Sequence, residues 1–243
     1  MTSVRELYER WAEGSALEAA LDESLDPRGP EFLFEIFASL GPERGQVVVD
    51  VGARDGRHLA RFTEDFGLRA IGLDPVPGSP EVVEASIESM PLDDASADWI
   101  WCRDVLVHVD VERGLAECAR VLKPGGRMVA FVTLATARLE PRETAWLLNA
   151  VALTTLDGTR IEDAATAAGL GLMQKDEIGG EWRERMIEDG TWDPSAALLA
   201  ISRLHRRGET GPEADAVEAD KLWGVYQLIG KLRPTVYVWE RGA

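Results

Sequence analysis

The chain has 243 residues, with 26 Lys and Arg against 43 Asp and Glu, and a formal net charge of −17. A hydrophobic fraction of 45% is enough to bury a full core, which excludes a globally disordered chain. The acidic balance argues against a nucleic-acid binder, because neutralising phosphates needs a basic face. This length suits one α/β domain with an elaboration, or at most two small domains.

The cysteines and the apolar runs indicate a cytoplasmic protein. Cys102 and Cys118 provide neither a disulfide framework nor a zinc site. No apolar run reaches the roughly 18 residues of a membrane span. The charged, periodic start MTSVRELYERW is not typical of a signal peptide. We therefore expect no membrane partner, no nucleic-acid partner and no metal.

Residues 1–44 are predicted to form N-terminal helices. A capping box opens the first helix, whose apolar stripe includes Tyr8 and Trp11. The second helix begins with Pro30 in its first turn and ends at Gly41.

From residue 46 the pattern changes to alternating strands and helices. Apolar runs predict strands at 46–52, 69–74, 81–86, 98–102, 127–134, within 170–178, and at 235–240. Helices are predicted at 56–67, 110–122, 140–156 and from a capping box at Thr159 and Glu162 to Gly169. Such alternation is typical of a doubly wound, mostly parallel sheet.

Two segments depart from simple alternation. Residues 75–80 carry three prolines, so we expect an irregular loop there in place of a crossover helix. Residues 179–234 predict three helices, at 181–189, from Asp193 as N-cap to just before Gly208, and at about 213–231. This insertion has too few large apolar residues for a core of its own. We interpret it as a helical cap over a core of residues 45–178 and 235–243.

The first predicted strand ends in DVGARDG, residues 50–56, and continues into a helix. Glycine at such a junction lets a ligand approach the backbone closely. The second strand ends in Asp74, 24 residues after Asp50. A carboxylate at that position can accept both hydrogen bonds of a ribose diol. The loop and the acid together predict a nucleoside ligand.

Four segments, in this order along the chain, resemble the class I S-adenosylmethionine-dependent methyltransferases, in the branch that acts on small molecules. The segments are VVVDVGARDG, IGLD, SIESMPLDDASADWIWC and ECARVLKPGGRMVAF. The resemblance covers roughly residues 45–178, and RVLKPGGRMV is its most specific part. It implies a Rossmann-like α/β fold with a seven-stranded sheet in the order 3-2-1-4-5-7-6 and an antiparallel last strand. It also implies S-adenosylmethionine as cofactor, at the carboxyl ends of the first, second and fourth strands.

The resemblance assigns cofactor contacts by position. Asp50 would organise the loop or the ammonium of the cofactor, and Asp74 would hold the ribose hydroxyls. The glycine loop and the end of the fourth strand would border the methionine part and the methyl group. Ser86 and Ile87 would meet the adenine edge. The implied cofactor-binding residues are Asp50, Gly52, Ala53, Arg54, Asp74, Pro75, Ser86, Ile87, Cys102 and Arg103.

Three positions depart from the family pattern. Arg54 replaces a glycine, so its side chain must turn outward to avoid crowding the cofactor. Ser86 stands where the family often has an acid for the adenine amino group. The loop at 75–80 replaces a helix. These departures bear on cofactor affinity and adenine contacts, and they leave the glycine loop and Asp74 in place.

Methyl transfer requires alignment and exclusion of water, and a base for hydroxyl, thiol or protonated amine acceptors. Histidine is the natural base near neutral pH. We interpret His58 as a partly exposed helix residue and His205 as a solvated charge at a helix end. His108 follows the fourth strand, where the family brings acceptor and methyl together, so it is the candidate catalytic base. A structural role for His108 is the alternative.

Eight tryptophans against three tyrosines suggest an aromatic-lined pocket, with ordinary packing as the alternative. Glu181 and Glu184 share a helix face and could meet a cationic acceptor, or could be a solvated charged face. The candidate pocket residues are Tyr8, Trp11, Trp182, Trp223 and Tyr226.

The leading hypothesis is S-adenosylmethionine-dependent methyl transfer to an oxygen, nitrogen or carbon of a small, apolar or aromatic metabolite, in biosynthesis. One alternative keeps the cofactor as a scaffold for cyclisation or isomerisation. Another is a degenerate binding protein, which Arg54 and Ser86 favour. A dinucleotide dehydrogenase is disfavoured, because residues 52–56 lack the glycine pattern of that family. The expected partner is a small-molecule substrate, and a homodimer is left open.

Overall fold

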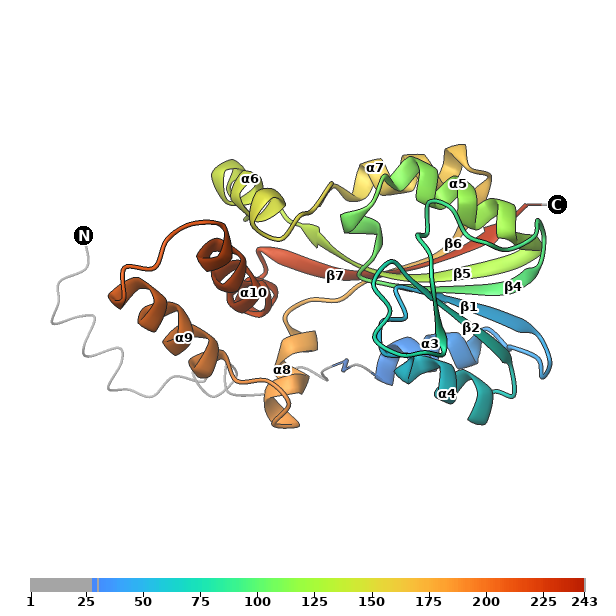
Figure 1. Cartoon of the computed structure of the whole chain (residues 1–243), viewed down its shortest axis with the longest axis horizontal. Coiled ribbons are helices and arrows are strands. Elements are labelled where there is room, and N and C mark those ends of the chain that lie inside the picture. The colour runs from blue at the N-terminus through green and yellow to red at the C-terminus, as the bar shows by residue number, and fades with distance from the viewer. Residues whose placement is uncertain (1–27, 30, 243) are drawn as a thin grey trace, which may run out of the picture.

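A central twisted sheet has helices packed on both faces and further helices at one end (Figure 1). The computed structural model describes residues 28–29 and 31–242. The sheet has seven strands in the order β3-β2-β1-β4-β5-β7-β6. Strand β1 pairs in parallel with β2 and β4, whereas β7 is antiparallel to both β5 and β6. The predicted Rossmann-like fold and its strand order are confirmed.

The predicted strands and helices of the described residues all occur. The strands are β1 (Val47–Val51), β2 (Arg69–Asp74), β3 (Val82–Glu84), β4 (Ala97–Arg103), β5 (Leu122–Ala135), β6 (Leu170–Glu177) and β7 (Leu232–Arg241). The helices are α3 (Glu31–Ser39), α4 (Arg57–Glu64), η1 (Leu106–His108, a 3-10 turn), α5 (Val111–Val121), α6 (Pro141–Ala150), α7 (Gly158–Ala167), α8 (Glu181–Glu188), α9 (Pro194–Arg206) and α10 (Pro212–Leu228). The predicted first helix, with Tyr8 and Trp11, lies outside the described residues.

The strands next to the candidate site are covered on both faces. All five residues of β1, with the sequence VVVDV, are buried, as expected for a parallel strand between two helical layers. On one face, Phe34 of α3 stacks on Trp101 of β4 with ring centroids 4.7 Å apart. On the other face, α5 buries Leu115 completely. Because helices pack on both faces of these strands, the strand ends that carry the site are held in place.

The connection between β2 and β3 is an irregular loop over residues 75–80, as predicted. Its backbone is held by two hydrogen bonds, from Val76 N to Asp74 Oδ1 at 2.8 Å and from Gly78 N to Arg54 O at 2.7 Å. Because no helix covers this connection, Val76 is 63% exposed and Val83 of β3 is 48% exposed. The loop therefore closes over the glycine turn instead of packing on the sheet.

Several predicted boundaries change: α6 ends six residues before the predicted 156, and β5 begins five residues before the predicted 127. The predicted capping box at Thr159 and Glu162 is wrong: α7 begins at Gly158, and Asp157 is its N-cap, accepting a hydrogen bond from Thr159 N at 2.9 Å. Glu162 instead accepts a hydrogen bond from Tyr237 Oη at 2.9 Å. Strand β7 begins three residues before the predicted 235, since buried Leu232 already pairs with the last residue of β5.

Helices α8, α9 and α10 form the predicted helical stretch before the last strand (Figure 1). Ala135 ends β5 and pairs with Leu232, which follows α10, so α10 approaches the carboxyl ends of the parallel strands. Gln227 of α10 is buried and donates a hydrogen bond from Nε2 to Thr133 Oγ1 of β5 at 3.0 Å. These contacts place α10 beside the ends of β4 and β5.

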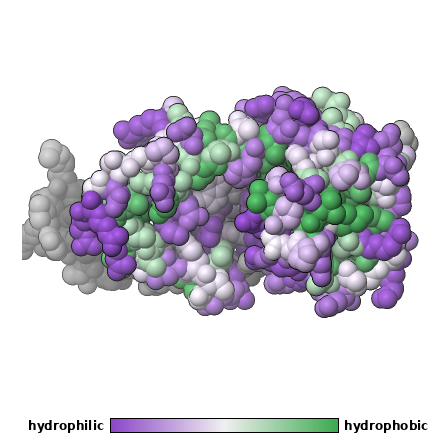
Figure 2. All heavy atoms as spheres, in the orientation of Figure 1, coloured by the Kyte–Doolittle hydropathy of each residue, from purple (hydrophilic) through white to green (hydrophobic). Residues whose placement is uncertain are grey.

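Hydrophilic residues cover much of the viewed face, including the end formed by α9, and hydrophobic residues gather in patches between them (Figure 2). Within the described residues, no helix combines the length and the apolar character needed to cross a membrane.

Candidate active site

The turn after β1 is built for close approach of a ligand to the backbone. Gly52 has φ +80°, and its N–H donates to Leu73 O at 2.8 Å. A Cβ on Gly52 would lie 2.4 Å from Cγ2 of Val105, so glycine is required at this position. Arg54 also has positive φ, at 45°, a conformation that glycine adopts more easily.

Asp74 joins this turn to the loop after β2. Its carboxylate is 8% exposed and accepts hydrogen bonds from Arg54 N at 3.0 Å and from Val76 N at 2.8 Å. The Arg54 side chain is exposed, and its guanidinium donates to the Val76 carbonyl. The Arg54 guanidinium thus lies against the loop after Asp74, and Asp74 keeps oxygen lone pairs for a further donor.

Asp50 supplies a buried carboxylate beside the turn. It is 2% exposed, and its Oδ2 accepts no hydrogen bond from the described residues. Nδ1 of His58 lies 3.5 Å from this oxygen. Burial raises the pKa of Asp50, partly offset by His58 and Arg103. An orphaned buried carboxylate oxygen fits a cationic donor such as the ammonium of S-adenosylmethionine, so the residues present fit this cofactor.

A cavity of about 230 Å³ lies at the turn. It brings together five of the predicted cofactor residues, Asp50, Gly52, Ala53, Arg54 and Arg103. The other lining residues are Asp55, Arg57, His58 and Asp104.

The remaining predicted cofactor residues lie outside this cavity. Asp74 is joined to it through Arg54 N, and Pro75 follows Asp74 in the loop. Ser86 Oγ accepts from Glu88 N at 3.2 Å, which uses the side chain in a local turn. Ile87 is 4% exposed and Cys102 is 1% exposed, both within the core, where burial raises the pKa of the Cys102 thiol.

A second cavity, of about 260 Å³, opens beside η1. It is lined by Asp104, Val107, His108, Val151, Leu153, Ala219, Asp220 and Trp223. Nδ1 of His108 lies 3.3 Å from the Ala152 carbonyl, which can only accept, so Nδ1 carries the hydrogen and Nε2 is left to accept a proton. The structure thus brings the candidate base and one predicted pocket tryptophan, Trp223, to the same cavity.

Asp104, which the sequence analysis missed, lines both cavities. It directly follows β4 and has a left-handed backbone, with φ 56°. Thr133 Oγ1 donates to its Oδ1 at 3.4 Å, and burial raises the pKa of Asp104 to about 6. An acid directly after a predicted buried strand was the signal that could have identified it, because strand ends carry the site in such sheets.

The other predicted pocket residues lie elsewhere. Trp182 is 3% exposed and packs on Phe131, with centroids 4.8 Å apart, in the core on the α3 face of the sheet. Tyr226 donates from Oη to Glu143 at 3.1 Å, between α10 and α6. Tyr8 and Trp11 are outside the described residues.

Two further candidates from the sequence already have partners. Glu181 is paired with Arg28 at 2.7 Å, so it is not a free group for a cationic acceptor. His205 lies 2.9 Å from Glu218 on the exposed side of α9, consistent with a solvated position.

Residues 49–130 match the family model described as a methyltransferase domain. An uncharacterized methyltransferase of Mycobacterium bovis is 30% identical over 147 residues, which are 56% of this chain and 58% of the relative. Methyltransferase GfsG of Streptomyces halstedii is 24% identical over 225 residues, 83% of this chain and 77% of the relative. The chain thus spans little more than half the length of the mycobacterial relative.

Solved structures share the fold. A putative sarcosine dimethylglycine methyltransferase from Galdieria sulphuraria has a TM-score of 0.64 at 20% identity, covering 87% of this chain and 84% of that chain. Geranyl diphosphate C-methyltransferase from Streptomyces coelicolor also has a TM-score of 0.64, at 16% identity, covering 86% and 78%. With the family match over residues 49–130, these likenesses confirm the resemblance to the class I S-adenosylmethionine-dependent methyltransferases. The match also supports S-adenosylmethionine as the cofactor.

Proposed function

We propose that the protein transfers a methyl group from S-adenosylmethionine to a small-molecule acceptor. The observation that carries this proposal is the position of Asp104, which forms a wall of both the cavity at the glycine turn and the cavity at His108. A group bound in one cavity can then meet a group bound in the other, which is the geometry that direct transfer needs.

The cofactor supplies a methyl group already activated on a sulfonium sulfur. Asp50 would pair with its ammonium, because Oδ2 is buried beside the turn without a hydrogen bond from the described residues. Asp74 would accept from the ribose hydroxyls with the lone pairs that Arg54 N and Val76 N leave free. Gly52 would let the cofactor approach the backbone.

The acceptor would occupy the cavity beside η1. His108 would take a proton from it at Nε2, with Nδ1 oriented by the Ala152 carbonyl. His108 is exposed at its outer side, so the proton can pass to solvent. Trp223, Val151 and Leu153 supply apolar walls for a small apolar or aromatic molecule and limit the access of water. In this proposal residues 179–234 act as a cap that supplies Trp223.

Named relatives support a small-molecule acceptor. A dimethylglycine N-methyltransferase of Parasynechococcus marenigrum is 38% identical over 104 residues, 35% of this chain and 37% of the relative. The solved structure from Streptomyces coelicolor is a geranyl diphosphate C-methyltransferase in complex with geranyl diphosphate. We extend the proposal to a biosynthetic role in the cytoplasm, where two free buried cysteines stay reduced.

Mass spectrometry tests the proposal. The purified protein is incubated with trideuteromethyl S-adenosylmethionine and a metabolite extract, and we expect S-adenosylhomocysteine together with a product that carries the deuterated methyl group. Omission of the cofactor is the control. A cofactor-dependent product without added mass would contradict transfer and favour a cyclase or isomerase. Absence of cofactor binding in calorimetry would favour a degenerate binding protein.

A further inference from the structure

The cavity beside η1 has acidic groups in its lining and no basic side chain other than a histidine among the described residues. Among the described residues its polar lining groups are the carboxylates of Asp104 and Asp220 and the imidazole of His108, and the remainder is apolar or aromatic. No described lysine or arginine lines it. A ligand that enters this cavity meets two acids, and an anionic group there would be repelled.

The charge of Asp104 is not cancelled by the basic groups that face it. The Asp104 carboxylate interacts through space with three basic groups, Arg103 of β4, Arg183 of α8 and His108 of η1. Its Oδ1 accepts a hydrogen bond from Thr133 of β5. Neither arginine is hydrogen-bonded to Asp104 within the described residues, where Thr133 is its side-chain donor.

Both arginines are held by other groups. The guanidinium of Arg103 lies over the Phe131 ring, 5.8 Å from its centroid. Arg183 donates from Nε to Gln227 Oε1 at 2.6 Å and lies over the Trp192 ring at 5.0 Å. Asp104 therefore presents to the cavity a carboxylate that has no direct ion pair with a described residue.

The backbone holds Asp104 in place between the two cavities. Asp104 has φ 56°, a left-handed conformation in which Asp and Asn are enriched among non-glycine residues, and its N–H donates to Phe131 O at 2.8 Å. Because this acid lines both cavities, a cationic ligand in the cavity beside η1 can meet its carboxylate.

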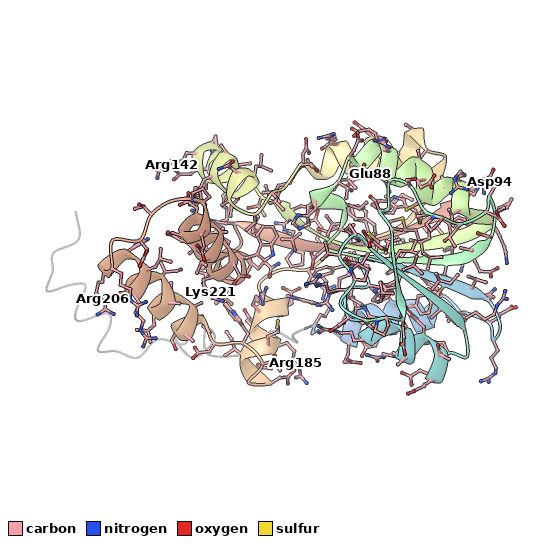
Figure 3. All side chains as sticks on the ribbon, viewed as in Figure 1. Glu88, Asp94, Arg142, Arg185, Arg206 and Lys221 are labelled. Atoms are coloured by element: carbon pink, nitrogen blue, oxygen red, sulfur yellow. The ribbon has the colours of Figure 1, made fainter. Side chains whose placement is uncertain are left out.

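Helix α10 completes the cavity with an aromatic face. Asp220 and Trp223 are three residues apart on α10, so their side chains share a helix face, and both line the cavity. Asp220 Oδ2 accepts from Nζ of Lys221 at 2.8 Å, and Lys221 is marked on α10 in Figure 3. An indole face attracts a cation through its quadrupole, which adds to the field of Asp104, whereas Asp220 is already paired with Lys221.

We propose that the acceptor is a primary or secondary amine that enters as its ammonium ion, held by Asp104 against the indole of Trp223, with Asp220 at the cavity edge. This inference rests on the proposed function. The ammonium gives one proton to His108 Nε2, and the freed nitrogen lone pair then bonds to the methyl carbon, whose former bonding pair stays on sulfur. The protonated His108 passes its proton to solvent.

The pH dependence of binding follows from Asp104. Burial raises its pKa to about 6, so the carboxylate is ionised at neutral pH and becomes neutral in mild acid. An alkylamine stays protonated over this range, as a lysine ammonium does. Amine affinity should therefore fall as the pH drops through about 6.

Three ligands of matched shape test the inference: benzylamine, benzyl alcohol and benzoate, titrated by calorimetry in the presence of saturating S-adenosylhomocysteine. We expect benzylamine to bind about tenfold or more tighter than benzyl alcohol, and benzoate to bind weakest. Asp104→Asn should weaken benzylamine binding about 10- to 100-fold, remove the fall in affinity that the protonation of Asp104 causes, and leave benzyl alcohol within about threefold. Glu213→Gln, which changes the same charge on α10 outside the cavity, should leave all three unchanged.

Benzoate as the tightest ligand, equal binding of all three, or no saturable binding of benzylamine below about 10 mM would overturn the inference. An equal loss for benzylamine and benzyl alcohol in Asp104→Asn would also overturn it, because it would show a damaged cavity and not a lost charge. Binding of S-adenosylhomocysteine alone is measured in the same titrations. If the unaltered protein does not bind S-adenosylhomocysteine, the proposed function is contradicted. If it binds S-adenosylhomocysteine but binds the three ligands equally well, only the inference of an amine acceptor is contradicted.

Discussion

Nδ1 of His58 lies 3.5 Å from Oδ2 of Asp50, so this imidazole faces a carboxylate on a residue that is 2% exposed. His58 is on the first turn of α4, and Asp50 is on β1. The pair joins the helix to the strand on one wall of the cofactor cavity. His58 is thus more than the partly exposed helix residue that the sequence predicted, because its ring is set against a buried charge.

Replacing His58 with Phe should destabilise the protein more as the pH rises. The pKa of Asp50 is raised in the folded state by burial, so ionising it costs folding free energy as the pH rises above about 3.8, and His58 offsets part of this cost. Phe keeps the ring contacts with Phe34 and Trp101 but has no ring N–H to offer the ionised Asp50 carboxylate. We expect a Tm loss that is larger at pH 7.5 than at pH 4.5, measured by scanning calorimetry. An equal loss at both pH values would point to packing alone.

Replacing Asp74 with Ala should weaken cofactor binding. The change removes the acceptor for the proposed ribose hydroxyls and also frees Arg54 N and Val76 N, so the loss should be about 2–3 kcal/mol, or roughly 30- to 150-fold in affinity. Titration calorimetry with S-adenosylhomocysteine measures it. Asp94→Ala, at the opposite end of the molecule from α9 (Figure 3), is the control and should bind normally. Unchanged affinity in Asp74→Ala would reject the ribose assignment.

Replacing Asp104 with Asn should stabilise the protein at neutral pH. Its folded pKa of about 6 exceeds the unfolded value of 3.8, so the folded carboxylate loses stability as the pH rises from about 4 through 6. Asn tolerates the left-handed backbone and has no charge to bury. The gain should be about 1–3 kcal/mol above pH 7 and should shrink toward pH 4, as read from urea unfolding. A gain that is independent of pH would argue against a buried charge at Asp104.

Replacing His108 with Ala should cut turnover by about 10²–10⁴-fold while cofactor affinity stays nearly constant. The physical reason is the loss of the proton acceptor at Nε2, since the ring makes only one side-chain hydrogen bond within the described residues, to Ala152 O. Turnover, S-adenosylhomocysteine affinity and Tm are measured on the same sample. Lower Tm together with proportionately weaker cofactor binding would instead show a structural histidine.

The sheet could be predicted because its strands carry a strong local signal. A run such as VVVDV, buried over all five residues, has few alternatives between two glycine-containing turns. The glycine turn and Asp74 were predicted for a similar reason, since both lie directly at strand ends. The side-chain geometry at Asp74 depends on the loop that the prolines at 75–80 force to be irregular.

The rest of the site depends on contacts between distant segments. Asp104 becomes a shared wall only because α10 returns beside β4, more than a hundred residues later in the chain. The pairing of His58 with Asp50 depends on how α4 packs on β1. The capping box at Thr159 failed because Asp157, two residues earlier, competes successfully for the same helix end.

The buried hydrogen-bond relay from Gln227 through Thr133 to Asp104 has a thermodynamic consequence. Moving α10 away from the sheet would break the bond between Gln227 and Thr133 and would change the surroundings of Asp104. A ligand that binds better with α10 in place would then shift the proton equilibrium of Asp104 to the extent that its pKa differs between the two positions of α10, and protonation would alter the affinity by the same factor. Binding of the acceptor, the position of α10 and protonation of Asp104 would then be thermodynamically coupled.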